Sequence, residues 1–225
     1  MNRGDSAYYL YVGDKVDTEK NMQDLLKKTL VLAGITAILY VLLFFFVDRA
    51  IDLWVHHNYA SGKVHQYGSY VSDSVKGGYI NLGLALGFLF VIIYDPGLEK
   101  HWVRNLLYIC VSAALAIIIG DGSKYLLGRY RPVMLFKHNL YGFHFFSSQW
   151  TLNSTPSGHT LRAFAILTAL SLVYRRLAVV FLSVALLIGV SRVAVTAHYP
   201  SDVLFGAFIG IFTAIWTYRY FGLRQ

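Results

Sequence analysis

Long apolar stretches separated by shorter polar segments dominate the chain. Uncharged runs occur at residues 29–47, 77–94, 105–120, 163–174, 177–191 and 203–218. A helix that crosses the hydrocarbon core of a bilayer needs about 20 mostly apolar residues, and only the first two runs come close to that length. The pattern predicts an all-α, polytopic membrane protein with six transmembrane helices, built as a single membrane-embedded domain over residues 1–225.

Charged residues cut the four shorter runs at one end. If each helix continues through these charged residues, it reaches a length usual for a membrane-spanning helix, for example at residues 104–128 and 158–174. Charged side chains inside a membrane are costly and generally face a polar cavity within the helix bundle. The interrupting residues are therefore candidates for a functional site: Asp121, Lys124, Arg162, Arg192 and Asp202.

Two segments outside the predicted spans are long and rich in aromatic residues. Residues 48–76 mix aromatic and polar side chains and are predicted to form an amphipathic interfacial helix. Residues 133–155 carry Phe136, Tyr141 and Trp150 among other aromatics. Such residues suit the headgroup level of a membrane, and they also suit the gripping of a substrate. Both interpretations of this second segment stay open.

Composition supports the membrane assignment and narrows the function. Hydrophobic residues make up 56% of the chain and charged residues only 14%, whereas soluble domains carry roughly 25% charge. The net charge of +8 comes from scattered basic residues, which favours a membrane surface over nucleic acid. No set of Cys, His or acidic residues has metal-ligand spacing, so no metal or other cofactor is expected. No obligate protein partner is evident, and the polar residues 1–28 are not expected to be a cleavable signal peptide.

Six spans would bring three polar strings to one side of the membrane. The first string follows the third span, the second precedes the fourth, and the third links the fifth and sixth. Lys and Arg are more frequent on the opposite side, with the Arg175–Arg176 turn as the clearest example, which places residues 1–28 in the cytoplasm. In this topology Arg129 is an ordinary loop residue. We expect a multi-pass protein of a bacterial inner membrane whose site faces the periplasm or exterior.

The first string is Lys124–x6–Arg131–Pro132. Two residues seven apart on one continuous helix lie two turns apart along the same stripe. Pro132 would then limit the continuation of that helix. The pair could aim two cations at one anion, or it could be two snorkelling side chains at a helix end.

The second string is Pro156–Ser157–Gly158–His159, with Thr155 or Ser157 as the expected N-cap of the fourth span. A helix N-terminus attracts anions because its N–H groups are unpaired and its dipole end is positive. Gly158 would allow close backbone approach to an oxyanion, and His159 could transfer a proton near neutral pH. Alternatively, this is a capped helix start with an incidental histidine.

The third string is Ser191–Arg192–x5–His198–x3–Asp202. Pro200 and Asp202 suit the first turn of the sixth span. His198 and Asp202 are four apart, so the carboxylate could bond one ring nitrogen, fix the tautomer and leave the other nitrogen free to attack. Arg192 could grip two phosphate oxygens with its planar guanidinium. The His–Asp pair could instead be two groups that satisfy each other at a turn.

Together the strings resemble the type-2 phosphatidic acid phosphatase superfamily, which shares its phosphate pocket with vanadium haloperoxidases and some bacterial acid phosphatases. The family pattern is K-x6-R-P, then P-S-G-H, then S-R-x5-H-x3-D, and all three occur in order between Lys124 and Asp202. The resemblance implies metal-independent hydrolysis of a lipid phosphate or pyrophosphate through a phosphohistidine. Candidate substrates are undecaprenyl pyrophosphate, phosphatidylglycerol phosphate, phosphatidic acid and lipid A phosphate.

The resemblance also implies roles for individual residues. His198 would be the nucleophile and Asp202 would orient it. His159 would protonate the leaving oxygen and then activate water. The residues that would bind the phosphate oxygens are Lys124, Arg131, Ser157, Gly158 and Arg192.

Arg162 lies outside the family pattern, three residues after His159 on the same helix face. We expect it either to contact a second anionic group of the substrate or to pair with a carboxylate such as Asp121. Asp121 could equally hold Lys124 in place.

Other activities remain open at this stage. A phosphotransferase would pass the phosphoryl group from His198 to another lipid, and a haloperoxidase would hold vanadate in the same pocket. A lipid-binding or transport protein with a degenerate pocket is less consistent with the intact strings.

Overall fold

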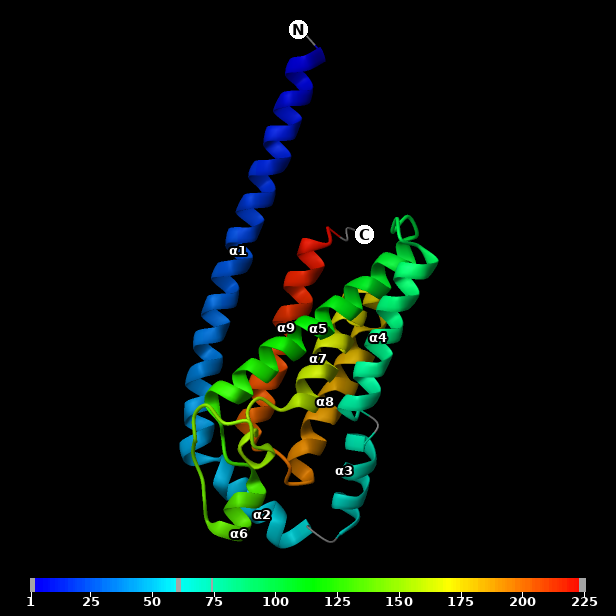
Figure 1. Cartoon of the computed structure of the whole chain (residues 1–225). Coiled ribbons are helices and arrows are strands. Elements are labelled where there is room, and N and C mark those ends of the chain that lie inside the picture. The colour runs from blue at the N-terminus through cyan, green and yellow to red at the C-terminus, as the bar shows by residue number, and fades with distance from the viewer. Residues whose placement is uncertain (1–2, 60–61, 74, 223–225) are drawn as a thin grey trace. The chain divides into compact units, whose positions relative to one another are not determined.

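The structure, a computed structural model, describes residues 3–59, 62–73 and 75–222, and their side chains from residue 19 onward. The described residues are almost entirely helical and contain no β-sheet, which confirms the all-α class. The α-helices, labelled in Figure 1, are α1 (Arg3–Phe46), α2 (Asp48–Tyr59), α3 (Lys63–Asp73), α4 (Gly77–Tyr94), α5 (His101–Leu127), α6 (Pro132–His138), α7 (Gly158–Val173), α8 (Ala178–Ala194) and α9 (Pro200–Tyr220). Short 3₁₀ turns occur at Trp150–Leu152 and Arg175–Leu177.

Each of the six predicted spans coincides with one helix: α1, α4, α5, α7, α8 and α9. Among the described residues, five helical segments are long and apolar enough to cross a membrane. The remaining span, α7, is a shorter apolar helix of 16 residues. The helices α5 and α7 continue through their charged residues, as the extended spans 104–128 and 158–174 predict.

The chain divides into two units, residues 1–38 and residues 39–225. The first unit lies within α1, and its large apolar side chains between Leu26 and Ile38 are exposed, as expected for a helix in lipid. Residues 1 and 2 of the predicted cytoplasmic segment lie outside the described part of the chain, and the side on which this segment lies stays a prediction. All contacts discussed below are within residues 39–225.

Residues 48–76 form two helices, α2 and α3, in place of the single helix expected. The α3 helix packs against α8. Gly68 makes this contact close, because a Cβ there would lie 2.9 Å from Cγ1 of Val195. The predicted interfacial location of these helices stays a prediction.

The centre of the bundle is α7, which packs against α5, α8 and α9. Leu161 of α7 is buried with Ala116 of α5 and Ile209 of α9. Gly206 and Gly210 lie on the face of α9 that meets α7, four residues apart. Small residues at this spacing let two helix backbones approach closely in a membrane. The N-terminal turn of α7 is therefore held tightly against α9.

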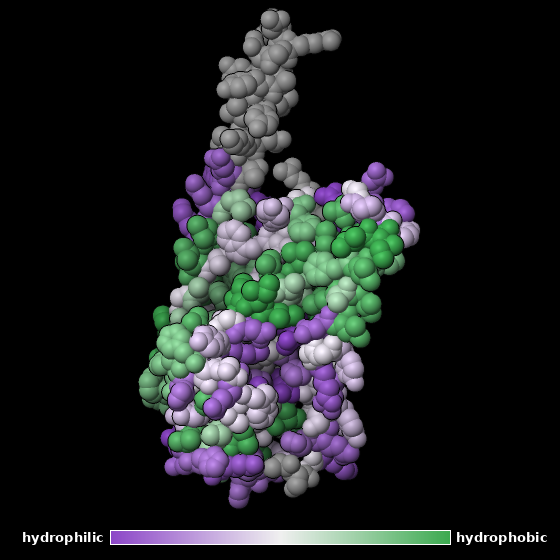
Figure 2. Space-filling model, in the orientation of Figure 1, coloured by the Kyte–Doolittle hydropathy of each residue, from purple (hydrophilic) through white to green (hydrophobic). Residues whose placement is uncertain are grey.

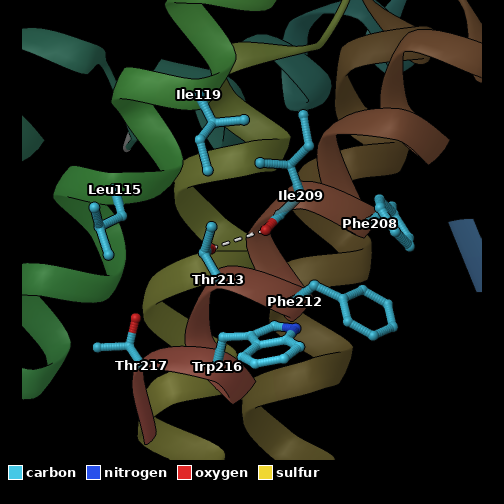
Figure 3. Close-up of a pocket in the computed structure, with 8 residues that line it drawn as sticks. All are labelled: Leu115, Ile119, Phe208, Ile209, Phe212, Thr213, Trp216 and Thr217. Carbon is cyan, nitrogen blue, oxygen red and sulfur yellow. Dashed lines mark hydrogen bonds between the residues drawn. The ribbon is translucent and has the colours of Figure 1, made fainter. Parts of the chain in front are cut away.

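Outside the core, the bundle shows an apolar band between polar ends (Figure 2). An apolar groove of about 310 Å³ runs along α5 and α9 within this band. Its wall is formed by the side chains drawn in Figure 3: Leu115, Ile119, Phe208, Ile209, Phe212, Thr213, Trp216 and Thr217. The Thr213 hydroxyl donates to the Ile209 carbonyl of its own helix (2.8 Å). The groove therefore offers little for recognising a polar headgroup.

Substitution of Gly210 by Ala should destabilise the bundle. A Cβ at this position would lie 2.6 Å from the Leu161 carbonyl oxygen and 2.8 Å from the Ala165 nitrogen, which are backbone atoms that cannot turn aside. Overpacking of this kind costs about 1–3 kcal/mol. The melting temperature of the purified protein in detergent should fall. Gly83→Ala is the matched control, because a Cβ at Gly83 meets nothing within 4 Å; equal melting temperatures for the two variants would contradict the proposed packing.

Candidate active site

The first polar string is not one helical stripe, which corrects the sequence prediction. Helix α5 ends at Leu127, and Gly128 follows with φ 54°. A Cβ on Gly128 would lie 1.7 Å from the His144 carbonyl oxygen, so only glycine fits this turn. Arg131 is consequently the N-cap residue of α6 rather than a residue of α5.

Lys124 and Arg131 nevertheless lie close together. They line one cavity of about 290 Å³, together with Asp121, Tyr125, Ser147, Ser148, Trp150 and Asn153. Lys124 Nζ is 2.9 Å from Asp121 Oδ1, as the sequence suggested. The Arg131 guanidinium lies 4.3 Å from the centre of the Trp150 ring. Two cations from different elements thus border the same space.

The second string forms the N-terminus of α7. Ser157 occupies the N-cap position, but its hydroxyl makes no capping bond and instead accepts one from Thr160 (2.9 Å). The Ser157 N–H donates to the Asp202 carbonyl (3.0 Å), which docks this turn on α9. A Cβ on Gly158 would lie 2.9 Å from Arg162 Nη1 and 3.1 Å from Lys124 Nζ. The absence of a side chain at this position lets both cations reach the helix N-terminus.

The structure brings the predicted cations together around the two histidines. The charges of Lys124, Arg131, Arg162 and Arg192 all act on His159, and those of Arg131 and Arg192 also act on His198. Burial lowers the pKa of Arg131 to about 10, and the neighbouring Arg192 acts in the same direction. Arg131 nonetheless remains charged at neutral pH. We call these four residues the cation cage.

Arg192 and Arg162 are held by different neighbours. Arg192 donates a hydrogen bond to the Ser72 hydroxyl, which ties α8 to α3. Arg162 Nη1 donates to the Gly158 carbonyl of its own helix (3.1 Å). Asp121 forms its ion pair with Lys124, so the expected alternative pairing with Arg162 is not made. Ser191, the remaining polar residue of the third string, donates back to Ile188 of α8 (2.7 Å).

His198 is positioned differently from the prediction. Its Nδ1 lies 2.7 Å from the Ser154 carbonyl oxygen but 3.8 Å from Asp202 Oδ2, too far for a hydrogen bond. A carbonyl can only accept, so Nδ1 carries the proton and Nε2 presents a lone pair. The backbone at Ser154, rather than the Asp202 carboxylate, fixes this tautomer.

The environment also keeps the His198 imidazole neutral. Burial lowers the pKa of His198 to about 3. The charges of Arg131 and Arg192 act in the same direction, and only the Asp202 carboxylate opposes them. A neutral imidazole with a free nitrogen is the form of histidine that acts as a nucleophile.

Asp202 instead anchors a buried network that the sequence analysis missed. Its Oδ1 accepts from Arg129 Nη1 (2.5 Å), and its Oδ2 accepts from the Ser154 hydroxyl (2.6 Å) and the Tyr199 N–H (3.0 Å). Arg129 Nη2 also bonds Asp48 Oδ2 (2.7 Å). The side chains of Arg129, Asp48 and Asp202 are fully buried.

The sequence analysis treated Arg129 as an ordinary loop residue, but its guanidinium is surrounded by aromatic rings. One of these rings, Tyr141, belongs to the aromatic segment 133–155, which gives that part of the segment a structural role. The guanidinium lies 4.4 Å from the Tyr199 ring centre and 5.6 Å from that of Tyr141. The Tyr141 hydroxyl accepts from Arg129 (3.2 Å) and donates to the Phe44 carbonyl (2.5 Å). Trp150, in contrast, is 63% exposed. Single-sequence spacing gave no sign of Arg129, because its partners Asp48 and Asp202 are far away in the chain.

One further buried carboxyl adjoins this network. Asp52 lies one turn after Asp48 on α2, and neither of its oxygens has a hydrogen-bond partner among the described residues. Burial, with the negative charges of Asp202 and Asp48, raises the pKa of Asp52 to about 9. The carboxyl is therefore neutral at physiological pH, which limits the cost of burying it.

Substitution of Arg129 by Met should strongly destabilise the protein. The change would leave the Asp48 and Asp202 carboxylates buried without their common cation, and breaking a buried pair in this way costs about 3–5 kcal/mol. Thermal unfolding in detergent should show a large loss. Arg49→Met is the matched control, because Arg49 is exposed; a loss no larger than that of the control would contradict the network.

The protonation of His198 can be measured by NMR with ¹⁵N-labelled histidine. At about pH 5, where an ordinary histidine of pKa about 6.5 is mostly charged, His198 should remain neutral with the proton on Nδ1. The signal is assigned as the one missing from His198→Gln. An imidazolium signal for His198 at this pH would show that burial does not control its protonation.

Comparison with known proteins gives relatives that match about half of the chain. The Lipid A 1-phosphatase of Rhizobium johnstonii is 36% identical over 112 residues, which cover 48% of this chain and 46% of that protein. The Lipid A 1-phosphatase of Porphyromonas gingivalis is 34% identical over 119 residues, 51% of this chain and 23% of that protein. The bacitracin transport permease protein BcrC of Bacillus licheniformis is 26% identical over 136 residues, 54% of this chain and 62% of that protein. The match spans less than two thirds of each relative.

Solved structures share the fold. The crystal structure of a transmembrane PAP2 type phosphatidylglycerolphosphate phosphatase from Bacillus subtilis superposes with a TM-score of 0.56 at 15% identity, over 86% of this chain and 95% of that one. LpxE of Aquifex aeolicus superposes with a TM-score of 0.58 at 21% identity, over 78% and 97%. The sequence profile of the PAP2 superfamily matches residues 105–225, which is more than half of the chain and contains all three polar strings. The chain therefore belongs to the PAP2 superfamily, as the three strings predicted.

Proposed function

We propose that the protein is a membrane phosphatase that hydrolyses a lipid phosphate or pyrophosphate through a phosphohistidine at His198, without a metal ion. The observation that carries this proposal is the His198 imidazole, which is held neutral by its surroundings and fixed at Nδ1 by the Ser154 carbonyl, 2.7 Å away. The cation cage beside it supplies the charge that binds a phosphoryl group. Membership of the PAP2 superfamily supports the same chemistry.

In the first step, Nε2 of His198 attacks phosphorus in line with the lipid oxygen. The N–P bond forms as the P–O bond breaks. The negative charge of the bound phosphate offsets the cation cage, so that His159 binds a proton in the complex and donates it to the leaving oxygen. In the second step, His159 accepts a proton from water, which attacks phosphorus and breaks the N–P bond. Inorganic phosphate leaves, and both histidines return to their starting states.

The cation cage serves the transition state of both steps. Phosphoryl transfer depends mainly on positioning and on neutralising the oxygens of the transferred group. Lys124, Arg131 and Arg192 would bind these oxygens, together with Ser157 and the backbone at Gly158. Arg162 adds a fourth positive charge and would contact a second anionic group of the substrate. Asp202 acts on His198 indirectly, because it bonds the hydroxyl of the residue whose carbonyl holds Nδ1.

Lipid A 1-phosphate is the first substrate to test, because similarity to proteins named Lipid A 1-phosphatase covers about half of the chain. Undecaprenyl pyrophosphate, phosphatidylglycerol phosphate and phosphatidic acid complete the panel. We place the protein in a bacterial inner membrane with the site facing the periplasm, in line with the Lys and Arg distribution.

His198→Ala should abolish phosphate release, whereas His159→Ala should slow it by about 10²–10⁴-fold, the usual contribution of general acid–base catalysis. With a ³²P-labelled lipid and quenching in alkali, which preserves phosphohistidine, labelled protein should be found in wild type and be lost in His198→Ala. The rate should persist in excess EDTA.

His138→Ala is the matched control, because His138 is exposed at the end of α6. Phosphate release by His198→Ala at the wild-type rate would refute the nucleophile. Label transferred to another lipid instead of water would identify a phosphotransferase.

A further inference from the structure

The cavity of about 290 Å³ beside the cation cage has a mixed polar and aromatic wall. Lys124 and Arg131 form its border with the cage, so the cavity is continuous with the proposed phosphate site. Tyr125, Trp150 and Asn153 are among the residues that line the rest. This wall contrasts with the apolar groove of Figure 3, which suits hydrocarbon. When Lys124 and Arg131 bind the phosphate oxygens, the group bonded to phosphorus would lie within reach of this cavity.

Polar groups in this wall have unused hydrogen-bonding capacity. Asn153 Oδ1 is buried and has no hydrogen-bond partner among the described residues, although its amide nitrogen donates to the Ser148 carbonyl (3.4 Å). The Asp121 carboxylate bonds Lys124 through Oδ1. The nearly buried Ser147 hydroxyl accepts the Gln149 N–H (3.3 Å). An acceptor such as Asn153 Oδ1 calls for a ligand with a hydroxyl or amide donor, because an unmade buried hydrogen bond is costly.

Trp150 gives the cavity a fixed aromatic wall. It begins the 3₁₀ turn Trp150–Leu152, whose Leu152 side chain is buried. The next residue, Thr151, accepts the Arg131 N–H (2.9 Å), and the Arg131 guanidinium lies over the Trp150 ring. The indole is nevertheless 63% exposed, which leaves much of its surface for a ligand. An aromatic ring of this kind offers both apolar area and a fixed orientation.

We infer that this cavity binds a sugar ring that carries the phosphate, so that the protein selects glycosyl phosphate lipids. The inference rests on the proposed phosphatase function and specifies its substrate class. A pyranose has hydroxyl groups around its edge, which could donate hydrogen bonds to Asn153 and Asp121. Its faces are made of C–H groups, which could pack on the Trp150 ring. In a polyprenyl pyrophosphate the group next to the cleaved phosphoryl is a second phosphate, whose oxygens only accept hydrogen bonds and would leave the Asn153 oxygen unpaired. Sites built to hydrogen-bond a substrate hydroxyl reject analogues that lack it.

The test compares one sugar lipid with one lipid that has no sugar. Phosphate release from lipid A 1-phosphate and from undecaprenyl pyrophosphate is measured for wild type, Asn153→Leu and Trp150→Phe. The result is expressed as kcat/KM for lipid A 1-phosphate divided by kcat/KM for undecaprenyl pyrophosphate. Asn153→Leu should lower this ratio by roughly 10- to 100-fold, since the proposed hydrogen bond to the ring is lost for the sugar lipid alone. The bond from Asn153 to the Ser148 carbonyl is lost for both substrates alike and cancels in the ratio. Trp150→Phe keeps an aromatic face and should lower it less. Gln149→Ala, exposed in the same loop but outside the cavity, should leave the ratio unchanged.

Binding provides a second measurement that does not depend on turnover. Full-length His198→Ala in detergent is titrated with glucosamine 1-phosphate and with glycerol 3-phosphate. Adding Asn153→Leu to this variant should lower the affinity for glucosamine 1-phosphate by the same roughly 10- to 100-fold. The affinity for glycerol 3-phosphate should stay unchanged.

Unchanged ratios in both cavity variants, or equal weakening of both soluble ligands, would overturn the inference. A lack of phosphate release from every lipid by wild type would instead overturn the proposed function. In that case the titration still decides whether the cavity binds the sugar.

Discussion

The site depends on one buried cation, Arg129, held between the carboxylates of Asp48 and Asp202. These three residues come from the start of α2, the link between α5 and α6, and the first turn of α9. Ser201 joins them, since its hydroxyl accepts from Arg129 (2.6 Å) and bonds Asp48. Removing three charges from water is expensive, and only mutual pairing with further hydrogen bonds offsets that cost. The segments can therefore pack here only in an arrangement that pairs both carboxylates with Arg129.

This buried network also positions the proposed catalytic groups, through Asp202. Asp202 bonds the Ser154 hydroxyl, and the carbonyl of the same residue holds His198. The Asp202 carbonyl accepts the N–H of Ser157, so the N-terminus of α7 is fixed to the same turn. Gly206 then allows that turn to lie against α9. The proposed nucleophile and the helix N-terminus beside His159 thus share one support, which is what catalysis by positioning requires.

The sequence was sufficient for features that depend on neighbours along the chain. Apolar runs, four of them extended through the charges at their ends, predicted all six helices. The position of Pro200 and Asp202 in the first turn of α9 followed from local helix chemistry. The family motifs assigned Lys124, Arg131 and Arg192 to one site, and in the structure the charges of all three act on His159. Features that depend on distant partners were missed. The close approach of the His144 carbonyl to Gly128, where α5 ends, is one such feature. The burial of Arg129 is another, because its partner Asp48 is too distant in the chain for any spacing rule.

The acceptor that holds His198 is a main-chain carbonyl, and this has an evolutionary consequence. Every amino acid has that oxygen, so replacement of the side chain at position 154 leaves the acceptor itself in the chain. The orientation of the imidazole is thus inherited through the path of the polypeptide rather than through the identity of a residue. Related sequences would retain the same ring geometry wherever another side chain at this position, or another contact, keeps the chain path that the Ser154 hydroxyl fixes here. A comparison of side chains alone would overlook what holds the histidine.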